Sequence, residues 1–161
     1  FIVDCVNSKF ISTAGEYTQR FENEIKQFTK SKYVLSVING TAALHLAIVV
    51  LGIKENEEIL LPSMTFVATG NAILYNNAIP VFLDVDIDTM GLSPFAVEEF
   101  LEEYGEIRQD GCYNKFSGRK IAACMPMHTF GFPVHLKKLI IICKKWKHQN
   151  LISRTIWTVR K

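Results

Sequence analysis

Three residues that suit anion binding, Asn39, Gly40 and Thr41, stand between a β-branched run and an almost wholly apolar run. The flanking stretches predict a strand over residues 32–38 and a helix over residues 41–51. The free N–H groups at a helix N-terminus attract anions, phosphate in particular. Gly40 would let the backbone approach the anion, and Thr41 adds a hydroxyl. An ordinary helix cap explains the same residues, and the turn is neither a P-loop nor GxGxxG.

Two later stretches place further candidate side chains after predicted strands. In "LPSMTFVATGNAILY", Phe66 begins the next helix, where its ring could stack on a planar cofactor. The alternative is that Phe66 belongs to the core. In "MPMHTFGFP", His128 follows a strand and could hydrogen-bond a ligand at the same sheet edge, although a structural histidine explains it equally well.

The acidic run "VFLDVDIDT" admits two other readings. Aspartyl-phosphate enzymes place DxDx[T/V] after an apolar strand, but Asp88 stands where Thr or Val is needed after Asp84 and Asp86. In a calcium loop, Thr89 would occupy the glycine position and Phe95 the position of the bidentate glutamate. We interpret the carboxylates as a solvated, capping strand-to-loop turn, and we expect no metal site.

The remaining pattern alternates helices and strands, which predicts βαβ units, a mostly parallel sheet and an α/β fold of three α-β-α layers. Helix 41–51 is apolar almost all round, so it should be buried on both sides and end at Gly52. Ser93 and Pro94 suit the start of a helix. The other expected elements are helices over 16–30, 65–77, 93–104 and 134–147, strands over 57–62, 79–86 and 120–127, and a surface loop over 105–119.

Composition narrows the function classes. The chain has 161 residues, 48% of them hydrophobic, and a formal net charge of +2, which gives no argument for binding nucleic acid or an anionic membrane. The longest apolar run, residues 42–51, is much shorter than the roughly 20 residues of a membrane span. We find no signal peptide. The four cysteines show no CxxC pair, which predicts reduced thiols and a cytoplasmic protein: Cys5, Cys112, Cys124 and Cys143.

Four stretches, in order and spacing, resemble motifs of the DegT/StrS family of PLP-dependent nucleotide-sugar aminotransferases. They are "NGTAALHLAIVVLGI", "LPSMTFVATGNAILY", "IPVFLDVDIDTMGLSP" and "MPMHTFGFP", and the resemblance runs from about Ile11 to Trp146. "ISTAGEYTQRFE" and "RKIAACMPMHTFG" look closest to the branch that acts on UDP-4-keto-6-deoxy-N-acetylhexosamines, which feeds bacillosamine- and legionaminic-acid-type sugars. The resemblance implies that residues 1–150 form part of a fold-type I large domain.

The resemblance also implies roles for individual residues. Gly40, Thr41 and Ala42 match the loop that holds the pyridoxal 5'-phosphate (PLP) phosphate, and Phe66 matches the aromatic residue over the pyridine ring. His128 matches the family's His-x-x-Gly motif, with its role open. Family members are usually homodimers that move an amino group from glutamate to PLP and then to a nucleotide-linked keto sugar.

The end of the chain departs from the family. Members need a lysine for the Schiff base and an acidic residue at the pyridine nitrogen, but this chain reads "HQNLISRTIWTVRK" after the predicted helix. Lys161 follows an unrelated sequence, so we assign it no role. Residues 151–161 form a divergent tail, which a frameshift or truncation would explain. We therefore expect an N-terminal fragment that is inactive alone and binds PLP weakly or not at all, or a non-catalytic remnant that pairs with a full-length partner.

Overall fold

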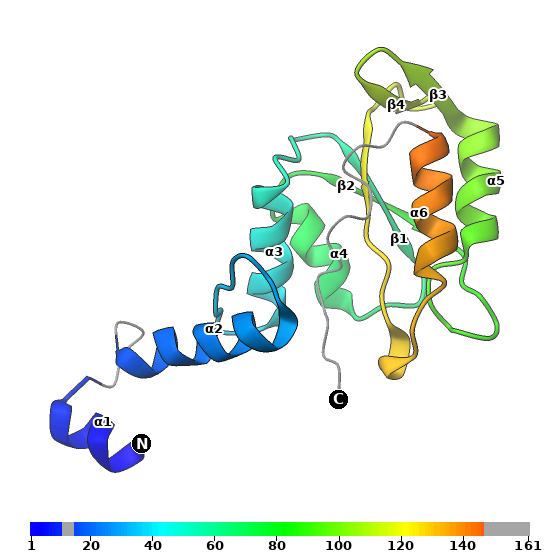
Figure 1. The fold of residues 1–161 in the computed structure, drawn as a ribbon. Helices are drawn as coiled ribbons and strands as arrows, with labels where there is room; N and C mark the ends of the chain where they lie inside the picture. Colours follow the sequence, from blue (N-terminus) through cyan, green and yellow to red (C-terminus); the bar gives the residue numbers. More distant parts are fainter. Residues whose placement is uncertain (11–14, 147–161) are drawn as a thin grey trace. The chain divides into compact units, whose positions relative to one another are not determined.

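The computed structural model describes residues 1–10 and 15–146 (Figure 1). The chain divides into two compact units, Phe1–Ile38 and Asn39–Lys161. The first unit holds α1 (Ile2–Ser8) and α2 (Glu16–Thr29). Helix α2 confirms the helix expected over residues 16–30. The predicted tail 151–161 lies outside the described residues.

The predicted strand over 32–38 is wrong. This segment pairs with no strand in the described part of the chain, and Tyr33 and Ile38 are 79% and 93% exposed. The Ser36 N–H and hydroxyl both donate to Glu22 Oε1 on α2, at 2.7 and 2.8 Å. The β-branched run fits a strand locally, but a strand also needs a partner for its backbone groups, and here a side chain takes that place.

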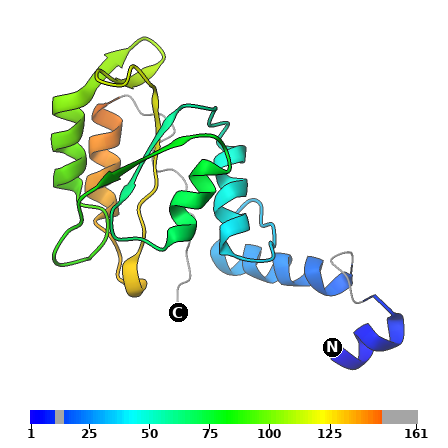
Figure 2. The same cartoon turned by 180° about the vertical axis from the view of Figure 1, so that it is seen from behind.

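A parallel sheet forms the middle layer of the second unit. Its order is β2-β1-β5, with β1 (Glu58–Pro62) in the centre, β2 (Ile79–Leu83) on one side and β5 (Ile121–Cys124) on the other. Helices α3 (Gly40–Val50) and α4 (Val67–Leu74) cover one face, while α5 (Pro94–Tyr104) and α6 (Leu136–Lys145) cover the other (Figures 1 and 2). This arrangement confirms the predicted three-layer α/β fold.

The alternation of side chains along β1 creates two cores. Leu60 points into the cluster formed with α5 and α6, whereas Ile59 and Leu61 point into the cluster formed with α3 and α4. All three side chains are fully buried. A central strand of a parallel sheet is covered on both faces, which is why "EILLP" reads as a continuous apolar run.

Helix α3 begins and ends as predicted but is not buried on both sides. Leu44 and Ile48 are buried, whereas Val49 and Val50 are 53% and 61% exposed. Leu51 follows the helix, and Gly52 then takes a left-handed φ of 70°. The outer face of α3 is therefore apolar and uncovered in the described part of the chain.

The surface loop predicted over 105–119 contains a β-hairpin instead. Strand β3 (Gly105–Arg108) pairs antiparallel with β4 (Gly111–Asn114), and the register pairs Arg108 with Gly111. The two turn residues between the paired Arg108 and Gly111 are Gln109 and Asp110, so the Asp110-Gly111 dipeptide does not occupy the central positions where Asp-Gly signals a two-residue hairpin. Gly111 has a φ of 152°, and a Cβ there would stand 2.8 Å from Lys120 Cε.

Helix α5 begins as the sequence predicts. The Ser93 hydroxyl accepts a hydrogen bond from the Ala96 N–H at 3.3 Å, and Pro94 occupies the first turn. Among the described residues, no helix is both long and apolar enough to cross a membrane.

Candidate functional site

The N-terminus of α3 keeps two amides available for a ligand. Asn39 has an extended backbone, and its Oδ1 accepts a hydrogen bond from the Ala42 N–H at 2.9 Å. The N–H groups of Gly40 and Thr41 donate no hydrogen bond within the described residues. The first turn carries no acidic side chain. These are the conditions under which a helix start binds an anion, with Ala42 serving the cap and Gly40 and Thr41 remaining free.

Phe66 lies directly before α4, and its side chain is 73% exposed. The core alternative for this residue is therefore wrong. The preceding Thr65 Oγ1 is 2.8 Å from Thr69 Oγ1 and 3.3 Å from Met127 Sδ, which holds the β1–α4 turn against the segment that follows β5. An uncovered aromatic ring on a fixed turn can stack on a planar ligand.

The helix starts and strand ends gather at one edge of the sheet. Helices α3 and α4 both begin on the side of the sheet to which the carboxyl ends of β1 and β5 point, and the segment after β5 leads into the 3-10 turn η1 (Thr129–Gly131) on that side (Figures 1 and 2). In open α/β sheets this edge is where ligands bind. The fold thus brings the elements that carry all the predicted site residues to one end of the sheet; stacking by Phe66 stays a prediction.

His128 is fixed by the backbone. Its Nδ1 accepts a hydrogen bond from the Val134 N–H at 3.1 Å, so Nδ1 carries no proton. In the neutral ring the proton is on Nε2, which is the nitrogen left to donate to a ligand. The imidazole is half-buried. It therefore combines the structural role with one free donor.

Strained backbone marks the same edge. Phe130 and Met90 have left-handed φ values of 52° and 53°, which bulky side chains seldom adopt. The Thr129 hydroxyl donates to the Met90 carbonyl at 2.8 Å and so joins the two strained segments. Strain of this kind costs on the order of 1–3 kcal/mol per residue and clusters at functional sites. Sequence reasoning missed Thr129 and Met90 because their link spans 39 residues.

The three carboxylates of the acidic run do not form one group. Asp84 Oδ1 accepts a hydrogen bond from the next amide at 2.8 Å. Asp86 and Asp88 instead lie beside His135, whose Nε2 is 2.9 Å from Asp88 Oδ2. The expectation of a solvated turn fits Asp88, which is 66% exposed, but not Asp86, whose side chain is 20% exposed. The sequence did not single out His135, because it lies 47 residues from Asp88.

The three α-β-α layers and the free amides at the start of α3 define an α/β domain with a helix start at the carboxyl edge of its sheet, which is where such folds commonly bind phosphate groups. The chain belongs to the DegT/DnrJ/EryC1/StrS aminotransferase family, whose family model matches residues 2–150.

Individual known proteins are similar to the chain. It is 33% identical over 144 residues to GDP-perosamine synthase of Escherichia coli O157:H7, a match that covers 89% of this chain and 35% of the relative. A DegT DnrJ EryC1 StrS aminotransferase from Brucella abortus shares the fold, with a TM-score of 0.75 at 23% identity over 92% of this chain and 37% of that one. NtdA of Bacillus subtilis, whose structure holds the cofactor PMP, has a TM-score of 0.68 at 24% identity over 83% of this chain and 27% of that one. The chain spans about a third of the length of these relatives.

Proposed function

We propose that this chain supplies the phosphate-binding end of a PLP site in an aminotransferase that acts on a nucleotide-linked keto sugar, with glutamate as amino donor. Family membership supports the reaction class. The observation that carries the proposal is the start of α3, where Gly40 and Thr41 present free amides at the carboxyl edge of the sheet. The UDP-4-keto-6-deoxy-N-acetylhexosamine branch remains our proposal for the substrate.

The residues at this edge fit the phosphate and ring of such a cofactor. Two backbone N–H groups and the Thr41 hydroxyl are donors for phosphate oxygens, and the positive end of the α3 dipole favours the charge. Gly40 has no side chain to hold the anion away. Phe66 would lie against the ring, and His128 Nε2 would donate to a ligand oxygen, because its other nitrogen is already occupied.

When bound, PLP supplies the electron sink that amino transfer needs. This chain's residues would hold and orient it: Gly40 and Thr41 at the phosphate, and Phe66 at the ring. The family's lysine and ring-nitrogen carboxylate have no counterpart that we can assign in residues 1–146. We therefore propose that the chain by itself binds the cofactor only weakly, through the phosphate and ring contacts, and does not complete the transfer.

A binding titration tests the phosphate site. Pyridoxamine phosphate is added to the chain while its phosphorus resonance is followed by NMR. Thr41→Ala should weaken binding by about twofold to tenfold, the worth of one hydrogen bond, whereas Thr41→Ser keeps the hydroxyl and should bind normally. Equal affinity of Thr41→Ala and the natural chain would contradict the assignment.

The proposed contact of Phe66 with the cofactor ring can be tested against a control substitution at Phe116, next to β4. Phe66→Leu should weaken pyridoxamine phosphate binding, because a stacked ring loses its aromatic partner. Phe116→Leu removes a ring that is 90% exposed next to β4 and should leave binding unchanged.

A separate incubation tests the activity of the chain alone. With PLP, glutamate and a UDP-4-keto sugar, the chain should yield no 2-oxoglutarate; formation of 2-oxoglutarate would overturn the proposal that the chain alone is inactive.

A further inference from the structure

Two carboxylates and an imidazole meet on the α5–α6 side of the sheet, apart from the residues assigned to the cofactor. Asp86 and Asp88 lie in the turn after β2, and His135 is the residue before α6. One ligand atom from each lies within 4.8 Å of the others. Nε2 of His135 is 2.9 Å from Asp88 Oδ2 and 4.0 Å from Asp86 Oδ2.

The turn that carries the carboxylates is held by its own backbone. The Asp86 N–H donates to the Gly91 carbonyl at 2.9 Å, and the Met90 N–H donates back to the Asp86 carbonyl at 2.9 Å. The His135 carbonyl accepts from the Leu139 N–H, which fixes that residue to the first turn of α6. The three side chains are therefore presented by positioned backbone.

One oxygen in this cluster lacks a partner. Asp86 Oδ2 is closed off from solvent, and no hydrogen-bond donor reaches it within the described residues. A buried carboxyl oxygen without a hydrogen-bond partner costs free energy unless a cation or a donor meets it.

We propose that Asp86 Oδ2, Asp88 Oδ2 and His135 Nε2 bind a divalent transition metal ion such as Zn²⁺. Zn²⁺ takes imidazole nitrogen and carboxylate oxygen at about 2.0–2.2 Å, which sets neighbouring ligands of a tetrahedral site about 3.3 Å apart. The distances of 2.9 and 4.0 Å lie on either side of that value. The imidazole disfavours Ca²⁺ and Mg²⁺, which prefer oxygen ligands alone.

The metal would keep an open position toward a hollow of about 490 Å³ that the same three side chains line with residues of α5 and α6. Water would complete the coordination there. The lysines that line the hollow do not neutralise these carboxylates in place of a metal. Lys145 is paired with Glu98 at 2.9 Å and Glu102 at 3.3 Å, and Lys138 is exposed.

Zn²⁺ titration of the whole chain in a Cys5→Ser background, which removes the most accessible thiol, tests the site. The readout is competition with a chromophoric chelator. We expect one ion per chain, and His135→Ala should weaken binding by at least about tenfold, because losing even an outer-sphere partner costs that much. Co²⁺ in place of Zn²⁺ should give the visible spectrum of a site with one nitrogen and several oxygen ligands.

Matched controls separate this site from adventitious binding. Asp88→Asn should also weaken binding, whereas Asp110→Asn, at another exposed aspartate, and His45→Ala, on α3, should leave it unchanged. Circular dichroism reports whether each variant is folded. Because Asp88 is exposed, its variant keeps the test valid if His135→Ala unfolds. Zn²⁺ affinity that His135→Ala and Asp88→Asn leave unaltered, or that both control variants lower equally, would overturn the proposal.

Discussion

At the scale of single residues, two variants of Asn39 distinguish its capping of α3 from the proposed anion binding at the same helix start. Its Oδ1 satisfies the Ala42 N–H beside the two free amides. Asn39→Ala should lower the free energy of unfolding by about 0.5–2 kcal/mol through loss of the cap. Asn39→Asp keeps the cap but adds a negative charge, so it should leave stability unchanged or higher while weakening pyridoxamine phosphate binding. Urea unfolding measures the stability, and the phosphorus NMR titration measures the binding. If binding follows stability in the same way in Asn39→Ala and Asn39→Asp, the added charge has no effect of its own and no anion binds there.

The cysteines offer a second prediction at this scale. Cys112, Cys124 and Cys143 are buried, whereas Cys5 is partly exposed. Burial raises the pKa of the Cys112 thiol, and a hydrogen bond with Cys143 together with burial raises the pKa of the Cys124 thiol well above its ordinary value. Since the thiolate is the reactive form, a thiol reagent at neutral pH should modify about one thiol per folded chain and all four in denaturant. Rapid modification of a second thiol in the folded chain would contradict this burial pattern.

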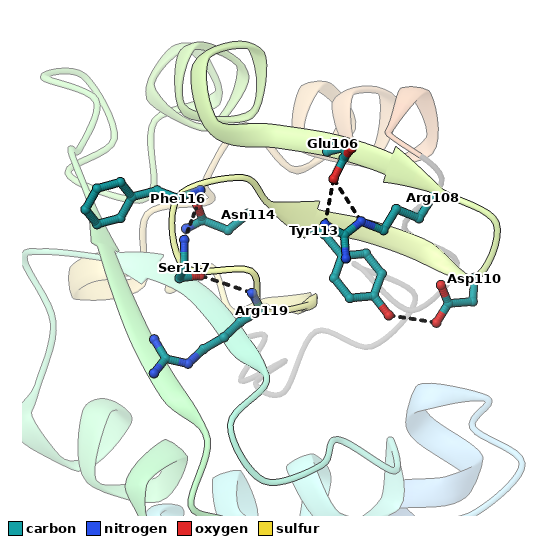
Figure 3. Close-up of polar contacts among 8 residues, drawn as sticks. All are labelled: Glu106, Arg108, Asp110, Tyr113, Asn114, Phe116, Ser117 and Arg119. Carbon is teal, nitrogen blue, oxygen red and sulfur yellow. Dashed lines mark hydrogen bonds and ion pairs between the residues drawn. The ribbon is translucent and has the colours of Figure 1, made fainter.

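At the scale of elements, a buried carboxylate joins the hairpin to the sheet. Glu58, at the start of β1, is 2% exposed and accepts hydrogen bonds from Asn114 Nδ2 at 3.0 Å and Ser117 Oγ at 2.5 Å. Asn114 Oδ1 in turn accepts from the amides of Phe116 and Ser117, which shapes the turn after β4 (Figure 3). The hairpin therefore depends on an acceptor more than 50 residues away in sequence.

Removing one donor tests this connection. Asn114→Ala should lower the free energy of unfolding by about 1–3 kcal/mol, because it leaves a buried carboxylate oxygen without its donor. Lys115→Ala changes the neighbouring exposed side chain and should have little effect. Chemical unfolding of both variants measures the difference. Equal stabilities would mean that water replaces the Asn114 amide at Glu58.

Sequence reasoning succeeded where local signals and burial agree. The apolar run of β1, the Ser93-Pro94 start of α5 and the Asn39-Gly40-Thr41 start of α3 are each specified by neighbouring residues. It failed where a distant partner decides the structure. Residues 32–38 meet the Glu22 side chain instead of a strand, and Asp88 meets a histidine 47 residues further along. The hairpin over 105–114 was missed for a similar reason: its turn residues, Gln109 and Asp110, are not a typical hairpin pair, and the distant Glu58 accepts a hydrogen bond from Asn114 at its end.

At the scale of the whole molecule, the α3–α4 layer carries apolar side chains that the described residues leave exposed. Val49 and Val50 on α3, Leu74 on α4 and Tyr75 after it are each more than half exposed, and the Tyr75 ring lies 5.9 Å from that of His45, which joins the two helices. An apolar patch of this kind marks a surface that associates with another protein or with a second copy. Such a surface is also what a non-catalytic remnant would need in order to pair with a full-length partner.

We expect the chain to self-associate through this layer. Its mass by light scattering should rise with concentration, because association removes apolar area from water at about 25 cal/mol per Å². Val50→Lys combined with Leu74→Lys should shift the chain toward monomer, since each would place a charge where the contact excludes water. Phe116→Lys changes an apolar residue that is even more exposed, next to the hairpin, and should leave the association intact. Two results would show that the α3–α4 layer is not the contact surface. The chain could stay monomeric at every concentration, or Phe116→Lys could dissociate it as strongly as the Val50→Lys and Leu74→Lys pair does.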